Sequence, residues 1–188
     1  MPWLIIIISY FLGSIPTAYI AGRIVAGRDI RHMGDENAGA ANVYRQLGPK
    51  AGIIVGIIDA AKGALVILIA QATNMSQIVV LFTGLAAVVG HNWPVYLGFR
   101  GGRGVSTTIG ILFVLLTIPM LILILPTLLI LIFRRNVTPA MAFMFILLPL
   151  VDWWLDVPPA LIAYGVALPA LTGITTFLRT RPKAIRHA

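Results

Sequence analysis

The chain has 188 residues, of which 59% are hydrophobic and 11% are charged, whereas a soluble domain usually carries about 25% charged residues. This composition, with a mean hydropathy of +0.96, excludes an ordinary soluble domain and indicates an integral membrane protein. The absence of cysteine excludes disulfides, thiolate metal sites and a cysteine nucleophile. We attribute the net charge of +8 to loops at an anionic membrane surface and expect no nucleic-acid partner.

The first apolar run, Pro2–Gly22, is long enough to cross a bilayer, because a spanning helix needs about 20 apolar residues. No basic segment precedes it, so we expect a retained helix and not a cleaved signal peptide. Five further apolar regions follow: Ala51–Ala72, Ile78–Leu97, Val105–Phe133, Val137–Val151 and Val157–Leu178.

A polar segment, Gly27–Lys50, follows the first run. Asn37 is a typical helix N-cap and Gly48-Pro49 a typical helix stop, so a short helix is predicted between them. Spacing of i, i+3, i+4, i+7 places apolar residues on one face of this helix, and Asn42 and Arg45 fall on the opposite face. The apolar residues are Ala40, Val43, Tyr44 and Leu47.

This short helix has two possible roles. Its N-terminus, with Gly34 and Gly39 nearby, can present free backbone N–H groups to an anion. It can equally be a connector that lies on the lipid headgroups, since amphipathic surface helices are common. Both interpretations stay open at this stage.

In the second apolar region Asp59 and Lys62 lie three residues apart. Asp59 is about 12 Å along the helix from Ala51, a depth at which ionisable groups are costly and are usually paired or functional. We expect the two charges to neutralise each other.

The segment Gly90–Thr108 is rich in glycine. Its glycines allow a ligand to approach the backbone closely, and Arg100 and Arg103 add positive charge. The next helix begins with Ser106, Thr107 and Thr108, where its dipole is positive, so the segment suits a phosphate. Its glycines are Gly98, Gly101, Gly102 and Gly104.

The glycine-rich segment has one alternative explanation, and one kind of phosphate site is excluded. An ordinary tight turn also explains such a run of glycines, and the chain lacks the G-x-x-x-x-G-K-[ST] pattern of a nucleotide P-loop.

His91 has no second histidine or carboxylate near it in sequence, so we predict no metal site. We expect His91 to orient the glycine-rich segment.

The long region Val105–Phe133 contains Pro119 and Pro126. Lys and Arg favour cytoplasmic loops, and every one of these residues except Lys62 falls on one membrane face if this region is two short spans that turn near 117–119. We therefore predict an all-α membrane protein with seven transmembrane helices, its N-terminus outside and its C-terminus cytoplasmic.

The chain reads as one multi-pass domain, residues 1–188, without an internal repeat. It is too small for the two halves of a typical transporter, and its polar segments lie at one face and not at the bilayer midplane. A small transporter is therefore the less favoured interpretation.

Three segments in this order resemble one family, the bacterial acyl-phosphate:glycerol-3-phosphate acyltransferases (PlsY). They are "GSIPTAYIAGRIVAGRDIRHMG…N.GA.NVYRQLG" at 13–48, "DAAKG" at 59–63 and "GHNWPVYLGFRGGRGVST" at 90–107. The resemblance covers nearly the whole chain in length, in number of spans and in motif order.

The resemblance implies an enzyme of phospholipid synthesis in the bacterial inner membrane, with its active face cytoplasmic. Members move an acyl chain from acyl phosphate to the 1-hydroxyl of glycerol 3-phosphate and give lysophosphatidic acid and phosphate, without a metal or other cofactor. The implied partners are these two substrates, or a related phosphorylated polyol, and membrane lipid. The implied contacts are Gly34, Asn37, Gly39, Asn42, Arg45, Gly101, Gly102, Arg103 and Gly104.

The chain departs from the family pattern at several positions. Asp35 and Glu36 replace a serine and a glycine, and Arg103 replaces a lysine, which changes a point charge into a planar fork. The family's C-terminal His and Asn do not follow Arg179, and His187 lies further on. These departures leave a second hypothesis open, namely a non-catalytic member that binds lipid or partners an active acyltransferase.

The acidic pair Asp35 and Glu36 has its own alternatives. Negative charge just before a helix stabilises the helix but competes with a bound dianion. The carboxylates therefore either fill the anion site themselves, or one of them acts as a base toward a hydroxyl. With His91, the pair makes up the candidate catalytic residues.

Overall fold

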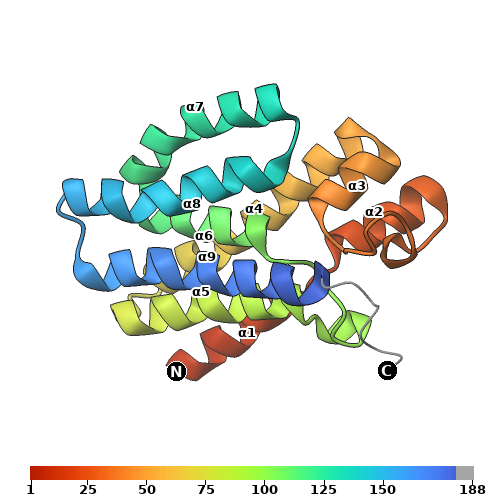
Figure 1. The fold of residues 1–188 in the computed structure, drawn as a ribbon. Coiled ribbons are helices and arrows are strands. Elements are labelled where there is room, and N and C mark those ends of the chain that lie inside the picture. Colours follow the sequence, from red (N-terminus) through yellow and green to blue (C-terminus); the bar gives the residue numbers. More distant parts are fainter. Residues whose placement is uncertain (181–188) are drawn as a thin grey trace, which may run out of the picture.

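The computed structural model describes residues 1–180, which form an all-helical bundle (Figure 1). In chain order the elements are α1 Pro2–Ser14, α2 Thr17–Ala26, the 3-10 turn η1 Ile30–His32, α3 Ala40–Leu47, α4 Pro49–Ala72, α5 Gln77–Asn92, the 3-10 turn η2 Val95–Leu97, α6 Val105–Leu115, α7 Thr117–Arg134, α8 Val137–Trp154 and α9 Pro159–Thr180. The basic residues Arg181, Lys183 and Arg186 of the tail, and His187, lie outside the described residues.

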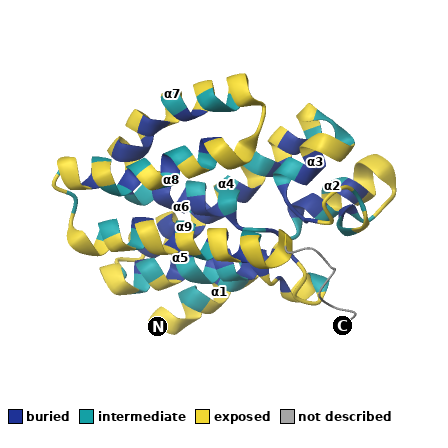
Figure 2. Cartoon of the chain, in the orientation of Figure 1, coloured by how far each residue is buried: buried dark blue, intermediate teal, exposed yellow. Residues whose placement is uncertain are grey.

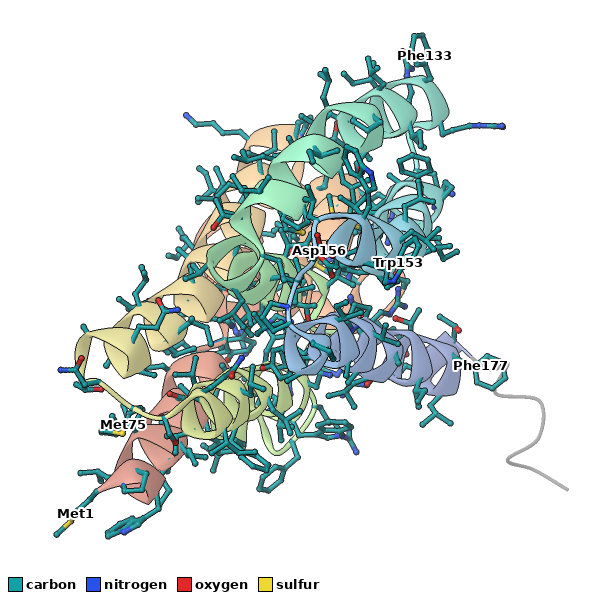
Figure 3. All side chains as sticks on the ribbon, turned by 90° about the vertical axis from the view of Figure 1, so that its left-hand side faces the viewer. Met1, Met75, Phe133, Trp153, Asp156 and Phe177 are labelled. Carbon is teal, nitrogen blue, oxygen red and sulfur yellow. The ribbon has the colours of Figure 1, made fainter. Side chains whose placement is uncertain are left out.

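Within the described residues, six helical stretches are long and apolar enough to cross a membrane. They are Pro2–Ala26, Pro49–Ala72, Gln77–Leu97, Thr117–Arg134, Val137–Trp154 and Pro159–Thr180. Many large apolar side chains are exposed on the outside of the bundle, as lipid contact requires. Figure 2 shows where exposed positions lie along the helices. Phe133 and Phe177 project from its body (Figure 3) and are 82% and 59% exposed.

The connections gather at two opposite ends of the bundle (Figure 1). The α4–α5 and α8–α9 connections lie at one end. The polar segment around η1 and α3, the connection from α5 to α6, the α7–α8 connection and the end of α9 lie at the other. The segments that the sequence marks as polar or glycine-rich therefore share one end of the molecule.

The first apolar run is not one continuous helix, so the prediction of a single helix over Pro2–Gly22 is wrong. The helix breaks at Ile15-Pro16 because a residue before proline is forced out of the α region, and Ile15 has φ −55° and ψ 117°. The Ile15 carbonyl accepts a hydrogen bond from Lys62 Nζ at 3.0 Å. Helix α2 continues past the predicted end and stops at Gly27, which has φ 64°.

The long apolar region divides where the sequence predicts. Helix α6 ends at Leu115, Leu116 leaves the helical conformation with φ −128° and ψ 49°, and α7 begins at Thr117. Pro119 lies in the first turn of α7, where a missing N–H removes no helical hydrogen bond. With eleven residues, α6 is only about 16 Å long.

Close backbone approach holds the centre of the bundle together. Helix α1 packs along α5, and α4 packs along α6. At Gly63 an added Cβ would meet the Thr107 carbonyl, and at Gly110 it would meet the Ala60 carbonyl. Small residues at such crossings are a common way for membrane helices to pack, and this crossing fixes the start of α6.

We expect Gly110→Ala to destabilise the protein by about 1–3 kcal/mol, because the added methyl group forces α4 and α6 apart. Thermal unfolding of the detergent-solubilised protein measures the change. The matched control is Gly173→Ala in α9, where an added Cβ meets nothing within 4 Å. Equal midpoints for the two variants would contradict the assigned packing.

Candidate active site

The short predicted helix is present as α3, but its start differs from the prediction. Gly39 is the N-cap, in extended conformation with φ −140° and ψ 163°, and its carbonyl accepts hydrogen bonds from the N–H groups of Asn42 and Val43. The prediction of Asn37 as N-cap is therefore wrong. The predicted stop at Gly48-Pro49 is confirmed, since α3 ends before Gly48 and α4 begins at Pro49.

The faces of α3 agree only in part with the predicted ones. Val43 is completely buried, Ala40 and Leu47 are half-buried, and Tyr44 is 49% exposed. Arg45 on the opposite face is exposed as expected. The prediction that Asn42 also points outward is wrong, because this side chain is completely buried.

The Asn42 amide holds the polar loop in place. Nδ2 donates to the backbone carbonyls of Met33 at 2.9 Å, Asn37 at 3.0 Å and Ile30 at 3.2 Å. Oδ1 accepts from the Asp35 N–H at 3.3 Å. Asn42 thereby fixes the backbone on which the acidic pair stands.

Asp35 joins the two arginines that the sequence assigns to anion binding. Its Oδ2 atom lies 2.8 Å from Nη2 of Arg45 on α3 and 3.4 Å from Nη2 of Arg103. Arg103 belongs to the glycine-rich segment, so the polar loop, α3 and that segment meet at one carboxylate. Among residues 1–180, the buried Nε of Arg103 has no hydrogen-bond partner.

The glycine-rich segment folds back on the end of α5. The N–H groups of Gly101 and Gly102 donate to the carbonyls of Asn92 and His91 at 3.2 and 3.1 Å, so both are already used within the protein. Gly104 has φ 84° and is the N-cap of α6. The first N–H groups of a helix lack partners within it, and those of α6 begin directly after Arg103.

Arg179 near the end of α9 closes this segment. Nη1 donates to the carbonyls of Gly101 and Gly102 at 2.5 and 2.6 Å, and Nη2 donates to that of Asn92 at 2.5 Å. From the sequence alone, Arg179 counts among the basic residues on the predicted cytoplasmic face, and its contacts with the glycine-rich segment are not predicted. The signal that pointed to more was its match to the arginine of the family's C-terminal segment.

A buried polar cluster lies beneath the glycine-rich segment. Asp59 Oδ1 lies 2.9 Å from Lys62 Nζ, which confirms the predicted pair, and it accepts a 2.5 Å hydrogen bond from Thr17 Oγ1. His91 Nδ1 lies 3.6 Å from the same oxygen. A Cβ at Gly102 would meet His91 Nε2, so the ring lies between this carboxylate and the glycine-rich segment.

His91 therefore has a carboxylate neighbour that its sequence context does not show. Helices α4 and α5 bring the two residues together. Among residues 1–180, the structure contains no group of three metal-ligating side chains of His, Cys, Asp or Glu.

Arg31, which is paired with Asp29, joins the polar loop to η2. Arg31 Nη2 lies 2.7 Å from Asp29 Oδ2, and Arg31 Nη1 donates to the Leu97 carbonyl at 2.9 Å. The hydrogen bonds from Arg31 lower the pKa of the Asp29 carboxyl below its usual value. The polar loop and the segment before the glycines are thus fixed relative to each other.

Comparison with known proteins agrees with the sequence motifs. A family model described as glycerol-3-phosphate acyltransferase matches residues 3–187. "Glycerol-3-phosphate acyltransferase 4" of Dehalococcoides mccartyi is 49% identical over 96% of this chain and 98% of its own length. The corresponding protein of Syntrophomonas wolfei is 38% identical over 89% of this chain and 85% of its own.

Two crystal structures of the integral membrane glycerol 3-phosphate acyltransferase PlsY (YgiH) have the same fold. The glycerol 3-phosphate form superposes with a TM-score of 0.85 at 33% identity, over 94% of this chain and 88% of that one. The lysophosphatidic acid form gives 0.81 at 32% identity, over 98% and 90%.

We expect Arg179→Met to leave the fold intact and to speed amide exchange at Gly101 and Gly102. Loss of hydrogen bonds from a charged donor removes about 1.5–3 kcal/mol, which corresponds to at least about a tenfold faster exchange. Hydrogen–deuterium exchange with mass spectrometry measures it. Arg134→Met, at the exposed end of α7, is the control, and equal exchange in both variants would rule out the closing role of Arg179.

We also expect the Asp29–Arg31 pair to stabilise the protein only above acidic pH. Since folding lowers the pKa of Asp29, its contribution is complete above the unfolded value of about 3.9 and disappears as pH falls through the folded value. Asp29→Asn should therefore cost about 0.5–1 kcal/mol at pH 7 and progressively less as the pH falls below about 3.9. Thermal unfolding of both proteins between pH 7 and 3 tests this, and a constant gap would contradict it.

Proposed function

Because the chain belongs to the glycerol-3-phosphate acyltransferase family, we propose that this membrane enzyme transfers an acyl chain from acyl phosphate to the 1-hydroxyl of glycerol 3-phosphate. The products are lysophosphatidic acid and inorganic phosphate. One observation carries the proposal most directly: Arg45 and Arg103 converge on one anionic group beside the N-terminus of α6. Two guanidinium forks and a helix N-terminus are the groups that bind phosphate in proteins.

The PlsY crystal structures support the acceptor and the product of this proposal. Their names describe a glycerol 3-phosphate form and a lysophosphatidic acid form, and this chain has their fold. The acyl phosphate donor is supported by the matching motifs at 13–48, 59–63 and 90–107.

The chemistry fits what the residues offer. The acceptor hydroxyl oxygen attacks the acyl carbon, and the new ester C–O bond forms as the bond from the acyl carbon to the phosphate oxygen breaks. The leaving phosphate takes up the proton that the hydroxyl loses. Because the acyl group is already activated, no covalent nucleophile is needed. The site mainly places the hydroxyl and the carbonyl together and stabilises negative charge.

The side chains then take distinct roles. Arg45 and Arg103 hold the anionic groups, with the first turn of α6 after Gly104. Asn42, which holds the loop that contains Gly34, Asn37 and Gly39, positions this side of the site. His91 and Arg179 position Gly101 and Gly102 from the other side.

The proposed topology has seven crossings, with α6 as the seventh, short one, the N-terminus outside and the C-terminus in the cytoplasm of a bacterial cell. The α7–α8 connection, which contains Arg134 and Arg135, lies at the same end as the polar loop and the glycine-rich segment (Figure 1). The α8–α9 connection at the other end contains Asp156. Basic residues favour the cytoplasmic side, which supports an active face there, within reach of soluble glycerol 3-phosphate.

We expect the purified protein in lipid vesicles to release phosphate from acyl phosphate only when glycerol 3-phosphate is present. Arg103→Ala should lower turnover by about a hundredfold, because it removes a charge that stabilises the transition state. Quantified lysophosphatidic acid and phosphate measure both effects, with Arg134→Ala as the control.

Two results would count against this assignment. Absence of acyl transfer from the wild-type protein to any small phosphorylated polyol would disprove the function itself. Unchanged turnover in Arg103→Ala would place the anion site elsewhere in the protein.

A further inference from the structure

We infer that Asp35 is an exchangeable counterion that competes with the phosphate of the acceptor for Arg45 and Arg103, and so sets how tightly a phosphorylated acceptor binds. This inference rests on the proposed function and adds a specificity-determining residue to it. Its first support is position. A single oxygen, Asp35 Oδ2, receives Nη2 of Arg45 at 2.8 Å and Nη2 of Arg103 at 3.4 Å, where an anionic ligand of the two arginines would place an oxygen.

The second support is that the backbone is fixed while the carboxylate is accessible. Asn42 Oδ1 holds the Asp35 N–H, and Asn42 is itself completely buried. The Asp35 side chain is 32% exposed and that of Arg45 is 52% exposed. Ion pairs this exposed are weak, so the carboxylate can rotate toward water without a change in the loop.

The third support is charge. Arg45 and Arg103 together have two positive charges, of which Asp35 neutralises one. A phosphate monoester has a charge of about −1.5 to −2 near pH 7. Addition of this dianion beside the carboxylate would place like charges against each other, whereas replacement of the carboxylate by the dianion lets the phosphate neutralise both guanidinium groups.

A fourth observation concerns the hydrogen-bond donors of Arg103. Its Nη2 faces Asp35, but its Nε is buried and has no hydrogen-bond partner within the described part of the chain. The Asp35 carboxylate, which is shared with Arg45, contacts Nη2 of Arg103 but leaves Nε without an acceptor among residues 1–180. A phosphate, with more acceptor oxygens, can receive both donors.

Two other roles for Asp35 predict different effects of its removal on acceptor binding and on kcat. If its pairs only stiffen the site, its removal loosens Arg45 and Arg103 and weakens acceptor binding. If the carboxylate takes the proton of the acceptor hydroxyl, its removal lowers kcat. An exchangeable counterion predicts tighter acceptor binding with kcat retained.

The decisive experiment compares wild type, Asp35→Asn and Asp35→Ser in lipid vesicles. Steady-state acyl transfer gives kcat and the KM for glycerol 3-phosphate, and calorimetric titration with glycerol 3-phosphate alone gives its affinity without turnover. We expect the KM and the Kd to fall about three- to tenfold in both variants, the range that one or two exposed ion pairs produce, with kcat within about twofold. The wild-type affinity should also weaken less steeply with added salt than that of the variants, because its arginines exchange one anion for another.

The matched control is Asp156→Asn. Asp156 is exposed in the α8–α9 connection at the opposite end of the bundle, and its φ of 52° is one that asparagine tolerates. This variant removes the same charge and should leave the KM and the Kd unchanged.

The outcomes separate this inference from the proposed function. A raised KM or a fall in kcat in the Asp35 variants, with wild-type acyl transfer intact, overturns the counterion role and leaves the enzyme assignment in place. Loss of folding in both variants overturns it too, because Asp35 would then be a structural counterion. Glycerol 3-phosphate that binds more tightly to the variants, although the wild-type protein transfers no acyl group, would support the counterion and disprove the function.

Discussion

Three backbone carbonyls, those of Asn92, Gly101 and Gly102, face one guanidinium group at the point where the helices of the bundle converge. Backbone that leaves helical structure near a membrane has to find partners inside the protein. Arg179 supplies them from the last described helix, and the N–H groups of Gly101 and Gly102 return to α5. The position of Arg103, the start of α6 and the proposed anion site all depend on these hydrogen bonds of Arg179.

A second constraint joins the first helix break to the same place. The break at Ile15-Pro16 takes the Ile15 carbonyl out of regular helical hydrogen bonding, Lys62 Nζ donates to this carbonyl, and Asp59 balances the charge of Lys62. Since Asp59 also lies beside His91, the buried charges in α4 connect the α1–α2 break with the backbone below the glycine-rich segment. The cluster is thus more than a neutralised pair, because it ties three helices to one another at the level of the site.

Much of this architecture is readable from the sequence, because its signals are local. Apolar runs, the basic residues around them and the prolines of 105–133 are enough to place the spans and the break before α7. Helix α3 and the Asp59–Lys62 pair follow from spacing. The features that the sequence does not predict depend on contacts between distant segments. The side chain of Asn42 turns inward because three loop carbonyls need a donor. Arg179 in α9 turns toward the glycine-rich segment, from which α6, α7 and α8 separate it in the chain. The break at Ile15-Pro16 has a local cause, the proline, but hydropathy alone does not reveal it because the chain is apolar on both sides.

The shortness of α6 bears on where the reaction takes place. Eleven residues rise about 16 Å, roughly half of a hydrocarbon layer of about 30 Å, so α6 on its own covers only about half of the crossing proposed for it. If it runs across the bilayer, one of its ends lies at the depth of the lipid tails, and the glycine-rich segment at its start is held by protein where lipid alone would not solvate it. The protein then brings the aqueous interface deeper into the bilayer at this point than it lies in the surrounding lipid. A water-soluble phosphate and a lipid-soluble chain can meet at that displaced boundary, while each remains in the phase it prefers.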